Sequence, residues 1–116
     1  MSTHADIILQ TEDGYKSIYL HFDGYPEHVM NMLVKFYSDR ETVEQMIELG
    51  NLSVLDESIS CPDGHSFNTP KSGFCIFYGR DRGEKDQQAV FSYSLEHHLE
   101  NSYSYLFTLD GEWKIV

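Results

Sequence analysis

The period of the hydrophobic pattern changes once near residue 25, and this change limits the folds open to the chain. Residues 5–11 (ADIILQT) and 15–22 (YKSIYLHF) are rich in β-branched and aromatic types, as in β-strands. The tripeptide EDG between them is typical of a tight hairpin turn. From Val29 onward, apolar residues recur every three or four positions, which is the spacing of one buried helix face. We therefore expect an antiparallel hairpin followed by a helix.

The segment HFDGYPE joins the second expected strand to this helix. Pro26 fits the first helical turn, and Asp23 is expected to cap free backbone amides at the helix start. In the preceding strand Ile18, Leu20 and Phe22 share one face, which we expect to point into the core.

A second helix and then a long loop are expected. Ser38 and Glu41 have the spacing of a capping box, and Gly50 is typical of a helix C-terminus. Residues 56–73 contain two prolines and two glycines and show little periodicity, so they are expected to form a loop. Loops of this length are uncommon in compact domains and are often functional. Further strands are expected at 74–79, 89–95, 103–109 and 113–116.

This order of elements predicts the fold class. Strands cluster at both ends of the chain with helices between them, in the order β-β-α-α, long loop and β-meander. We expect an α+β fold with an antiparallel sheet of about five to six strands and two helices packed on one face. The length of 116 residues is close to the commonest domain size, so residues 1–116 are expected to form a single domain.

The charge balance is unusual, with 19 acidic and 8 basic residues and a formal net charge of −11. Such a surface repels nucleic acid and anionic membranes, so we expect neither direct nucleic-acid binding nor membrane binding. No run of about 18 apolar residues is present, and the N-terminus lacks the pattern of a secretory signal. Cys61 and Cys75 are expected to be free thiols in a reducing compartment. These features predict a cytoplasmic protein.

Two interpretations of the acidic charge remain open. It can keep a small protein soluble, or it can meet a basic surface on a partner protein. On the second expected helix, acidic residues recur along one edge, where they could imitate a run of phosphates. The residues expected to contribute to such a partner surface are Asp39, Glu41, Glu44, Glu48, Asp56 and Glu57.

The spacing of histidine and cysteine does not predict a metal site. Cys61 stands four residues before His65 with no matching pair elsewhere, and the adjacent His97 and His98 point to different sides. We therefore expect no metal and no cofactor.

His21 and Asp23 alternate on the expected strand, so they share a face in a geometry suited to general acid–base chemistry. The simpler interpretation gives Asp23 the helix cap and His21 a hydrogen bond in the sheet. No nucleophile-elbow motif is present, and neither cysteine has a recognisable catalytic setting. Whether the protein is an enzyme stays open, and a non-enzymatic role is preferred.

The segment GRDRGEK is the only concentrated basic patch. Arg80 and Arg82 could clamp a phosphate or carboxylate, because guanidinium groups match both anions. The interleaved Asp81 and Glu84 favour internal ion pairs instead, and both interpretations remain open. Together with HFDGYPE, the candidate ligand-binding residues are His21, Asp23, Tyr25, Glu27, Arg80 and Arg82.

Three stretches, IYLHFDGYPEHV, LGNLSVL and YGRDRGE, resemble a family of small proteins encoded by phages, prophages and mobile elements. Typical members read Ile-Tyr-Cys-His-Trp-Asp-Gly-Tyr-Pro-Glu, then Leu-Gly-Asp/Asn-x-Ser, then Arg-Asp-Arg-Gly-Glu. The chain departs from this pattern at Leu20 and Phe22, where cysteine and tryptophan are common, so the resemblance does not carry thiol chemistry to this turn. The closing YLFTLDGEWKI is also similar. The matching positions are Ile18, Tyr19, His21, Asp23, Gly24, Tyr25, Pro26, Glu27, Leu49, Gly50, Asn51, Ser53 and Arg80 to Glu84.

The resemblance implies an accessory role in a host cell, such as host takeover or the blocking of host defences. Our leading expectation is a non-enzymatic protein that binds and inhibits a host defence protein through that protein's basic surface, as a possible nucleic-acid mimic. An alternative is a sponge for a nucleotide immune signal, with Arg80 and Arg82 on its phosphates and Tyr25 or Phe22 stacked on its base. The third is an enzyme acting on such a nucleotide, with His21 as base and Asp23 as its orienter.

Overall fold

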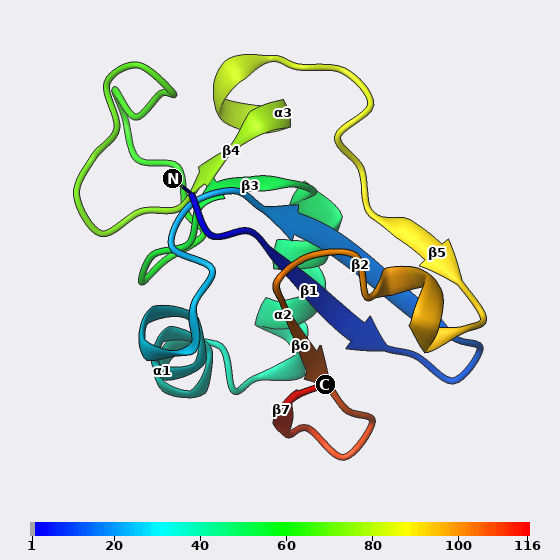
Figure 1. The fold of residues 1–116 in the computed structure, drawn as a ribbon. Helices are drawn as coiled ribbons and strands as arrows, with labels where there is room; N and C mark the ends of the chain where they lie inside the picture. The colour runs from blue at the N-terminus through cyan, green and yellow to red at the C-terminus, as the bar shows by residue number, and fades with distance from the viewer. Residues whose placement is uncertain (1) are drawn as a thin grey trace.

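The computed structural model describes residues 2–116 and has an α+β fold, with helices and a mixed, mostly antiparallel sheet (Figure 1). The strands are β1 (Ala5–Gln10), β2 (Tyr15–Leu20), β3 (Leu52–Val54), β4 (Ile76–Phe77), β5 (Val90–Ser92), β6 (Tyr103–Phe107) and β7 (Trp113–Ile115). The helices are α1 (Pro26–Phe36), α2 (Arg40–Leu49), the short α3 (Tyr78–Arg82) and the 3₁₀-helix η1 (Leu95–His98). The predicted α+β class is confirmed.

The sheet has the strand order β4-β3-β2-β1-β6-β7, and β5 pairs with β2 outside this path. The expected β1–β2 hairpin is confirmed, with Ile7 opposite Ile18 in an antiparallel pair. The C-terminal strands do not form the expected meander, because β6 runs parallel to β1 and β5 pairs with β2. Only β6 and β7 form an antiparallel pair within that region.

The position of β6 has a physical reason. After the hairpin forms, β1 has one unpaired edge, and β6 fills it with Tyr105 opposite Ile7. Both of these side chains are fully buried, as is Phe107. The pairing therefore places β6 inside the sheet between β1 and β7, so that β1 is not left as an edge strand.

The helices contribute to the same core as the strands. Val29 and Leu33 of α1 and Val43, Met46 and Ile47 of α2 are buried in one cluster with strand residues. Helix α2 contacts β1 and β2, and α1 contacts β7. The packing of both helices on one face of the sheet stays a prediction.

The helix ends differ in part from the expectation. Pro26 is in the first turn of α1 as predicted, but the N-cap is Tyr25, without a side-chain cap bond. Asp23 therefore does not cap the helix, and it has a left-handed backbone with φ of 55°. The cap of α2 is Asp39, one residue after the expected Ser38, and its carboxylate accepts a hydrogen bond from the backbone N–H of Thr42.

Two further expectations are corrected at strand ends. Phe22 does not point into the core, because β2 ends at Leu20 and the Phe22 side chain is 41% exposed. The expected strand at 74–79 is only two residues long, and the chain then forms α3, which ends at Gly83 in the left-handed conformation. Arg80 and Arg82 consequently lie on a short helix and not on a turn between strands.

Candidate functional site

His21 lies directly after β2 within a group of rings. Its Nδ1 is 2.7 Å from the hydroxyl oxygen of Tyr19, and its carbonyl oxygen accepts a 2.7 Å hydrogen bond from Nδ1 of His4. The His4 and His21 rings are stacked with centroids 4.6 Å apart. Phe22 and Tyr78 present their edges to the His21 ring. We call these five residues the histidine cluster.

The protonation chemistry of this cluster follows from the same contacts. Partial burial, and then the positive charge of a protonated His4, lower the pKa of His21. Burial and the neighbouring Tyr78 raise the pKa of Tyr19. A neutral imidazole held by a neutral phenol is therefore the favoured state near pH 7. The residue that orients His21 is Tyr19, and not Asp23 as the enzyme hypothesis required.

Asp23, Tyr25 and Glu27 are exposed. The turn that places them in solvent is fixed by the buried Gly24, whose N–H donates to the carbonyl of Thr3 and whose carbonyl accepts from the Tyr105 hydroxyl. These three side chains do not converge on His21 through any hydrogen bond within residues 2–116.

Arg80 is engaged by its own surroundings. Its Nε donates to Oδ1 of Asp81 at 2.9 Å, and its Nη2 donates to Oδ2 at 3.1 Å. The same guanidinium donates to the carbonyl oxygens of Ile59 and Cys75. The Arg80 guanidinium therefore binds groups of the protein itself. This agrees with the interpretation that the motif forms internal ion pairs.

Asp81 completes a buried network with His65. The Asp81 side chain has no exposed surface, accepts a 2.8 Å hydrogen bond from the backbone N–H of Phe77, and lies 3.5 Å from Nε2 of His65. Burial alone would raise the pKa of Asp81, but the hydrogen bonds from Arg80 and Phe77 and the Arg80 charge lower it overall. His65 accepts from the N–H of Lys71 at Nδ1 and donates from Nε2 to the carbonyl of Cys75. We call His65, Arg80 and Asp81 the loop-anchoring network, because their bonds hold the loop of residues 56–73.

Arg82 is the more accessible arginine. Its Nη1 is 3.4 Å from a carboxylate oxygen of Glu84, and both side chains are exposed. Its guanidinium lies over the Phe67 ring, which contacts the Tyr78 ring, which in turn contacts His21. The motifs HFDGYPE and GRDRGE therefore approach each other through rings. Within residues 2–116, neither arginine forms an ion pair or hydrogen bond with His21, Asp23, Tyr25 or Glu27.

The cysteines are free thiols, as expected. Cys75 is buried, and its sulfur lies 3.2 Å from the Tyr37 hydroxyl. Burial raises the pKa of the Cys75 thiol, which disfavours a thiolate nucleophile. Among residues 2–116, no three or more histidine, cysteine or acidic side chains are grouped so that they could hold a metal ion.

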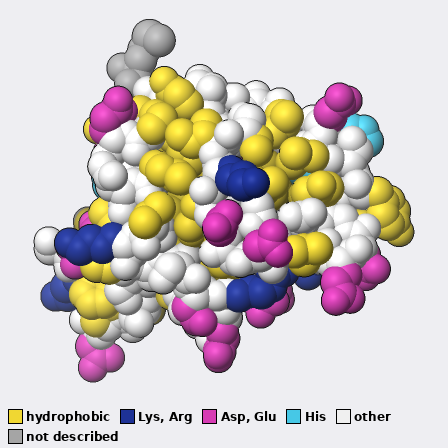
Figure 2. Space-filling model, turned by 90° about the horizontal axis from the view of Figure 1, so that it is seen from below, with side chains coloured by type: hydrophobic (Ala, Val, Ile, Leu, Met, Phe, Trp, Pro, Cys, Tyr) yellow, Lys and Arg dark blue, Asp and Glu magenta, His cyan; other side chains and the backbone are white. Residues whose placement is uncertain are grey.

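The acidic residues expected to form a partner surface lie in more than one region, including α2 and a hollow beside α1. Glu41, Glu44 and Glu48 are exposed on α2 at helical spacing, and Glu44 also lies 3.5 Å from Arg40. Glu57 lines a different hollow beside α1, together with Glu27. The six residues expected to form a partner surface therefore do not meet in one hollow of the described chain. Figure 2 shows acidic side chains spread over one face of the molecule among a smaller number of basic ones.

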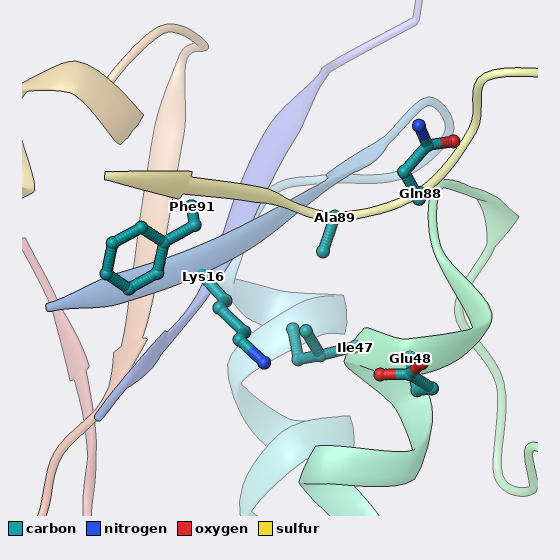
Figure 3. A pocket seen from close by; sticks show the side chains of 6 residues that line it. All are labelled: Lys16, Ile47, Glu48, Gln88, Ala89 and Phe91. Atoms are coloured by element: carbon teal, nitrogen blue, oxygen red, sulfur yellow. The ribbon is translucent and has the colours of Figure 1, made fainter. Parts of the chain in front are cut away.

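Two hollows flank Glu48, and no sequence motif indicates either of them. The first, of about 180 Å³, is lined by Lys16, Ile47, Glu48, Gln88, Ala89 and Phe91, and Figure 3 shows the Lys16 side chain reaching from β2 toward Ile47. The second is a groove of about 390 Å³ lined by Gln45, Glu48, Leu49, Ile59 and Ser60. The first hollow joins α2 to β2 and to residues 88–91, and the second joins α2 to residues of the loop that follows it, so neither lies within a single motif.

Within residues 2–116, no helix is long and apolar enough to cross a membrane. Compared with models of protein families, with curated proteins and with solved structures, the chain matches none of them.

Proposed function

We propose that the protein is a non-enzymatic, phage-type inhibitor that binds a basic surface of a host defence protein. The observation that supports this most directly is that few of its acidic side chains form ion pairs with basic ones. Of the 19 acidic residues, those that form an ion pair with lysine or arginine within residues 2–116 are Glu44, Asp81 and Glu84. The remaining excess acts on the surroundings of the protein and attracts a positively charged partner.

Helix α2 offers a regular part of this charge. The rise of about 1.5 Å per residue places Glu41 and Glu48 about 10 Å apart along the helix axis, with Glu44 between them. One strand of DNA carries about three phosphates over the same distance along its axis. This similarity supports the nucleic-acid-mimic form of the proposal, in which the host protein's basic site normally holds DNA or RNA.

Capture from host lysate at low and at raised salt tests this function. Steered association depends on unscreened charge, so we expect a captured protein that is released as salt rises and is displaced by a DNA or RNA oligonucleotide. Failure to capture any protein in a salt-dependent way, or capture that salt does not affect, would contradict the proposal.

A pair of charge-matched variants then locates the surface. The triple variant Glu41→Gln, Glu44→Gln and Glu48→Gln removes the α2 charges, and Glu96→Gln, Glu100→Gln and Glu112→Gln remove the same charge from other exposed positions. We expect the α2 variant to lose most of the capture and the control to retain most of it. Equal losses would show that net charge alone attracts the partner.

A second candidate, a sponge for a nucleotide immune signal, is supported by the continuous series of rings from His21 to Phe67 that ends at Arg82. Arg80 has no part in this version, because its guanidinium is already bound. A thermal-shift screen with linear and cyclic nucleotides tests it. Stabilisation that is lost in both Arg82→Ala and Phe22→Ala, but not in Arg40→Ala, would favour the sponge, and no stabilisation by any nucleotide would remove it.

A further inference from the structure

The C-terminal turn of α2 carries a glutamate, Glu48, that is in no ion pair with lysine or arginine within residues 2–116, although Lys16 lines the same hollow on one side of it. The helix has no basic residue in its last turn, and Glu48 lies in that turn. The carbonyl groups at a helix C-terminus carry a partial negative charge, so a glutamate there is repelled and a cation is attracted.

This charge lies at the wall of an open groove. The groove of about 390 Å³ runs between α2 and residues 59–60, and its volume is within the range of ligand-binding pockets. Leu49 and Ile59 are the apolar residues of its lining, and Glu48 and Gln45 are polar residues of the same lining. A long side chain with an aliphatic stem and a cationic end matches both parts of this lining.

We infer that this groove receives an arginine side chain of the basic partner, an inference that rests on the proposed function. A guanidinium can bind the Glu48 carboxylate through two parallel hydrogen bonds and is more weakly hydrated than an ammonium group, so it loses less on entering an apolar groove. A free metal ion is a poorer match, because one carboxylate does not provide the several oxygen ligands that such ions require.

The hollow on the other side of Glu48 determines the direction of docking. It contains Lys16, which repels a second cation, while Ile47, Ala89 and Phe91 offer apolar surface (Figure 3). The arginine therefore enters on the Ile59 side, and an apolar residue of the partner next to that arginine contacts the Phe91 side. The recognised segment is a basic one in which arginine and a large apolar residue are neighbours.

Titration of the ¹⁵N-labelled protein with short synthetic peptides tests this assignment. The probe repeats Leu-Arg-Gly, and two matched peptides repeat Leu-Lys-Gly and Ser-Arg-Gly. We expect the amide shifts to concentrate at residues 45–49 and 59–60, with the Leu-Arg-Gly peptide binding several-fold more tightly than either matched peptide. Shifts spread over all acidic segments, or equal binding of the three peptides, would overturn the arginine assignment.

Variants of the protein provide the second readout. Glu48→Gln should weaken binding of the Leu-Arg-Gly peptide by about tenfold, in line with the loss of a charged hydrogen bond. Glu112→Gln removes the same charge from an exposed position outside the groove and outside α2, so it should change binding by less than about twofold. Ile59→Ala should weaken binding while the net charge is unchanged. Equal effects of Glu112→Gln and Glu48→Gln would overturn the proposal.

Different experimental results would contradict this inference and the proposed function. If peptides do not bind at the groove while a host protein is still captured in a salt-dependent way, only the docking site is wrong. If no basic protein is captured and the peptides also do not bind, the proposed function fails together with it.

Discussion

Arg80 and Asp81 are neighbours in the chain, and their side chains form a two-pronged ion pair with Nε–Oδ1 and Nη2–Oδ2 distances of 2.9 and 3.1 Å. Arg80 also donates to the carbonyl oxygens of Ile59 in the long loop and of Cys75, and Asp81 accepts from the backbone N–H of Phe77 in β4. The most concentrated basic motif of an acidic protein is therefore used mainly to hold the structure together. Its other basic residues, Arg82 and Lys85, are exposed.

Replacing Asp81 by asparagine should destabilise the protein by about 3 kcal/mol, because it leaves the Arg80 charge without its partner in a largely buried site. Urea denaturation measures this change in the free energy of unfolding. We also expect faster proteolysis within residues 56–73, which the network anchors. The control Glu84→Gln breaks only an exposed pair and should change stability by less than about 1 kcal/mol. Equal effects would contradict the anchoring role.

The same carboxylate should make stability depend on acid. The pKa of Asp81 is lower in the folded protein than its ordinary value, so the ionised form favours folding. Its contribution is present above the ordinary pKa of about 3.9 and is lost as pH falls through the lower folded value. We expect the stability difference between the wild type and Asp81→Asn to shrink in this acidic range. A difference that stays constant to the lowest pH measured would be inconsistent with this pKa.

His21 should titrate below the usual range of histidine. The pKa of His21 is lowered from 6.5 by burial and by His4, so protonation favours the unfolded chain. The contribution of His21 to stability is present above 6.5 and is lost as pH falls through the folded value. NMR titration of the ring protons measures the pKa directly. His4→Asn keeps a hydrogen-bond donor but removes the neighbouring charge, so it should raise the pKa of His21, and no rise would contradict the assigned cause.

Gly50 should tolerate a side chain far less well than Gly83. Both have positive φ, but a Cβ at Gly50 would lie 2.3 Å from the carbonyl oxygen of Gln87, while a Cβ at Gly83 meets nothing within 4 Å. Gly83→Ala should cost about 1 kcal/mol from backbone strain alone. Gly50→Ala should cost about 3 kcal/mol, because the segment before β5 must also move. Thermal denaturation of both variants measures the difference, and similar losses would show that no close approach exists.

Asp6 should be essential for the connection between η1 and β6. Its buried carboxylate accepts hydrogen bonds from the N–H groups of Glu100 and Asn101, the Asn101 amide and the Ser104 hydroxyl. Asp6→Ala leaves these donors without their acceptor and should destabilise the protein by about 3 kcal/mol. Glu100→Ala changes only an exposed side chain and should have an effect within about 0.5 kcal/mol. If Asp6→Ala changed the free energy of unfolding as little as Glu100→Ala does, the prediction would be wrong, and water would have to accept the hydrogen bonds in place of the carboxylate.

Local sequence patterns were sufficient for several elements. The β1–β2 hairpin, both long helices and the β6–β7 pair follow from hydrophobic period and turn residues that lie within short windows. The end of α2 at Gly50 also follows, because its φ of 90° is a conformation that favours glycine. The cap was misplaced by one residue at α2, since Ser38 and Asp39 are both good capping residues and only the backbone geometry distinguishes them.

The candidate site was predictable only in part. The sequence identified His21 and the arginines as unusual, and it raised internal pairing for Arg80 as one interpretation. It did not indicate that Tyr19 holds His21, or that His65 lies beside the buried Asp81 that pairs with Arg80. Those partners are ordinary residues in isolation, and their roles depend on which segments the sheet brings together.

What the sequence by itself determined is the type of each long element and the strongly negative charge, because both depend on composition and on neighbours within a few residues. The tertiary structure decided that β6 pairs in parallel with β1, that Arg80 is enclosed, and that Glu48 borders a groove shared with Ile59. These features require contacts between different elements, because β6 is distant from β1 in the chain and Ile59 lies beyond the end of the helix that carries Glu48. They form only when burial of the whole core offsets the entropy of closing the intervening loops, so no short window of sequence contains them.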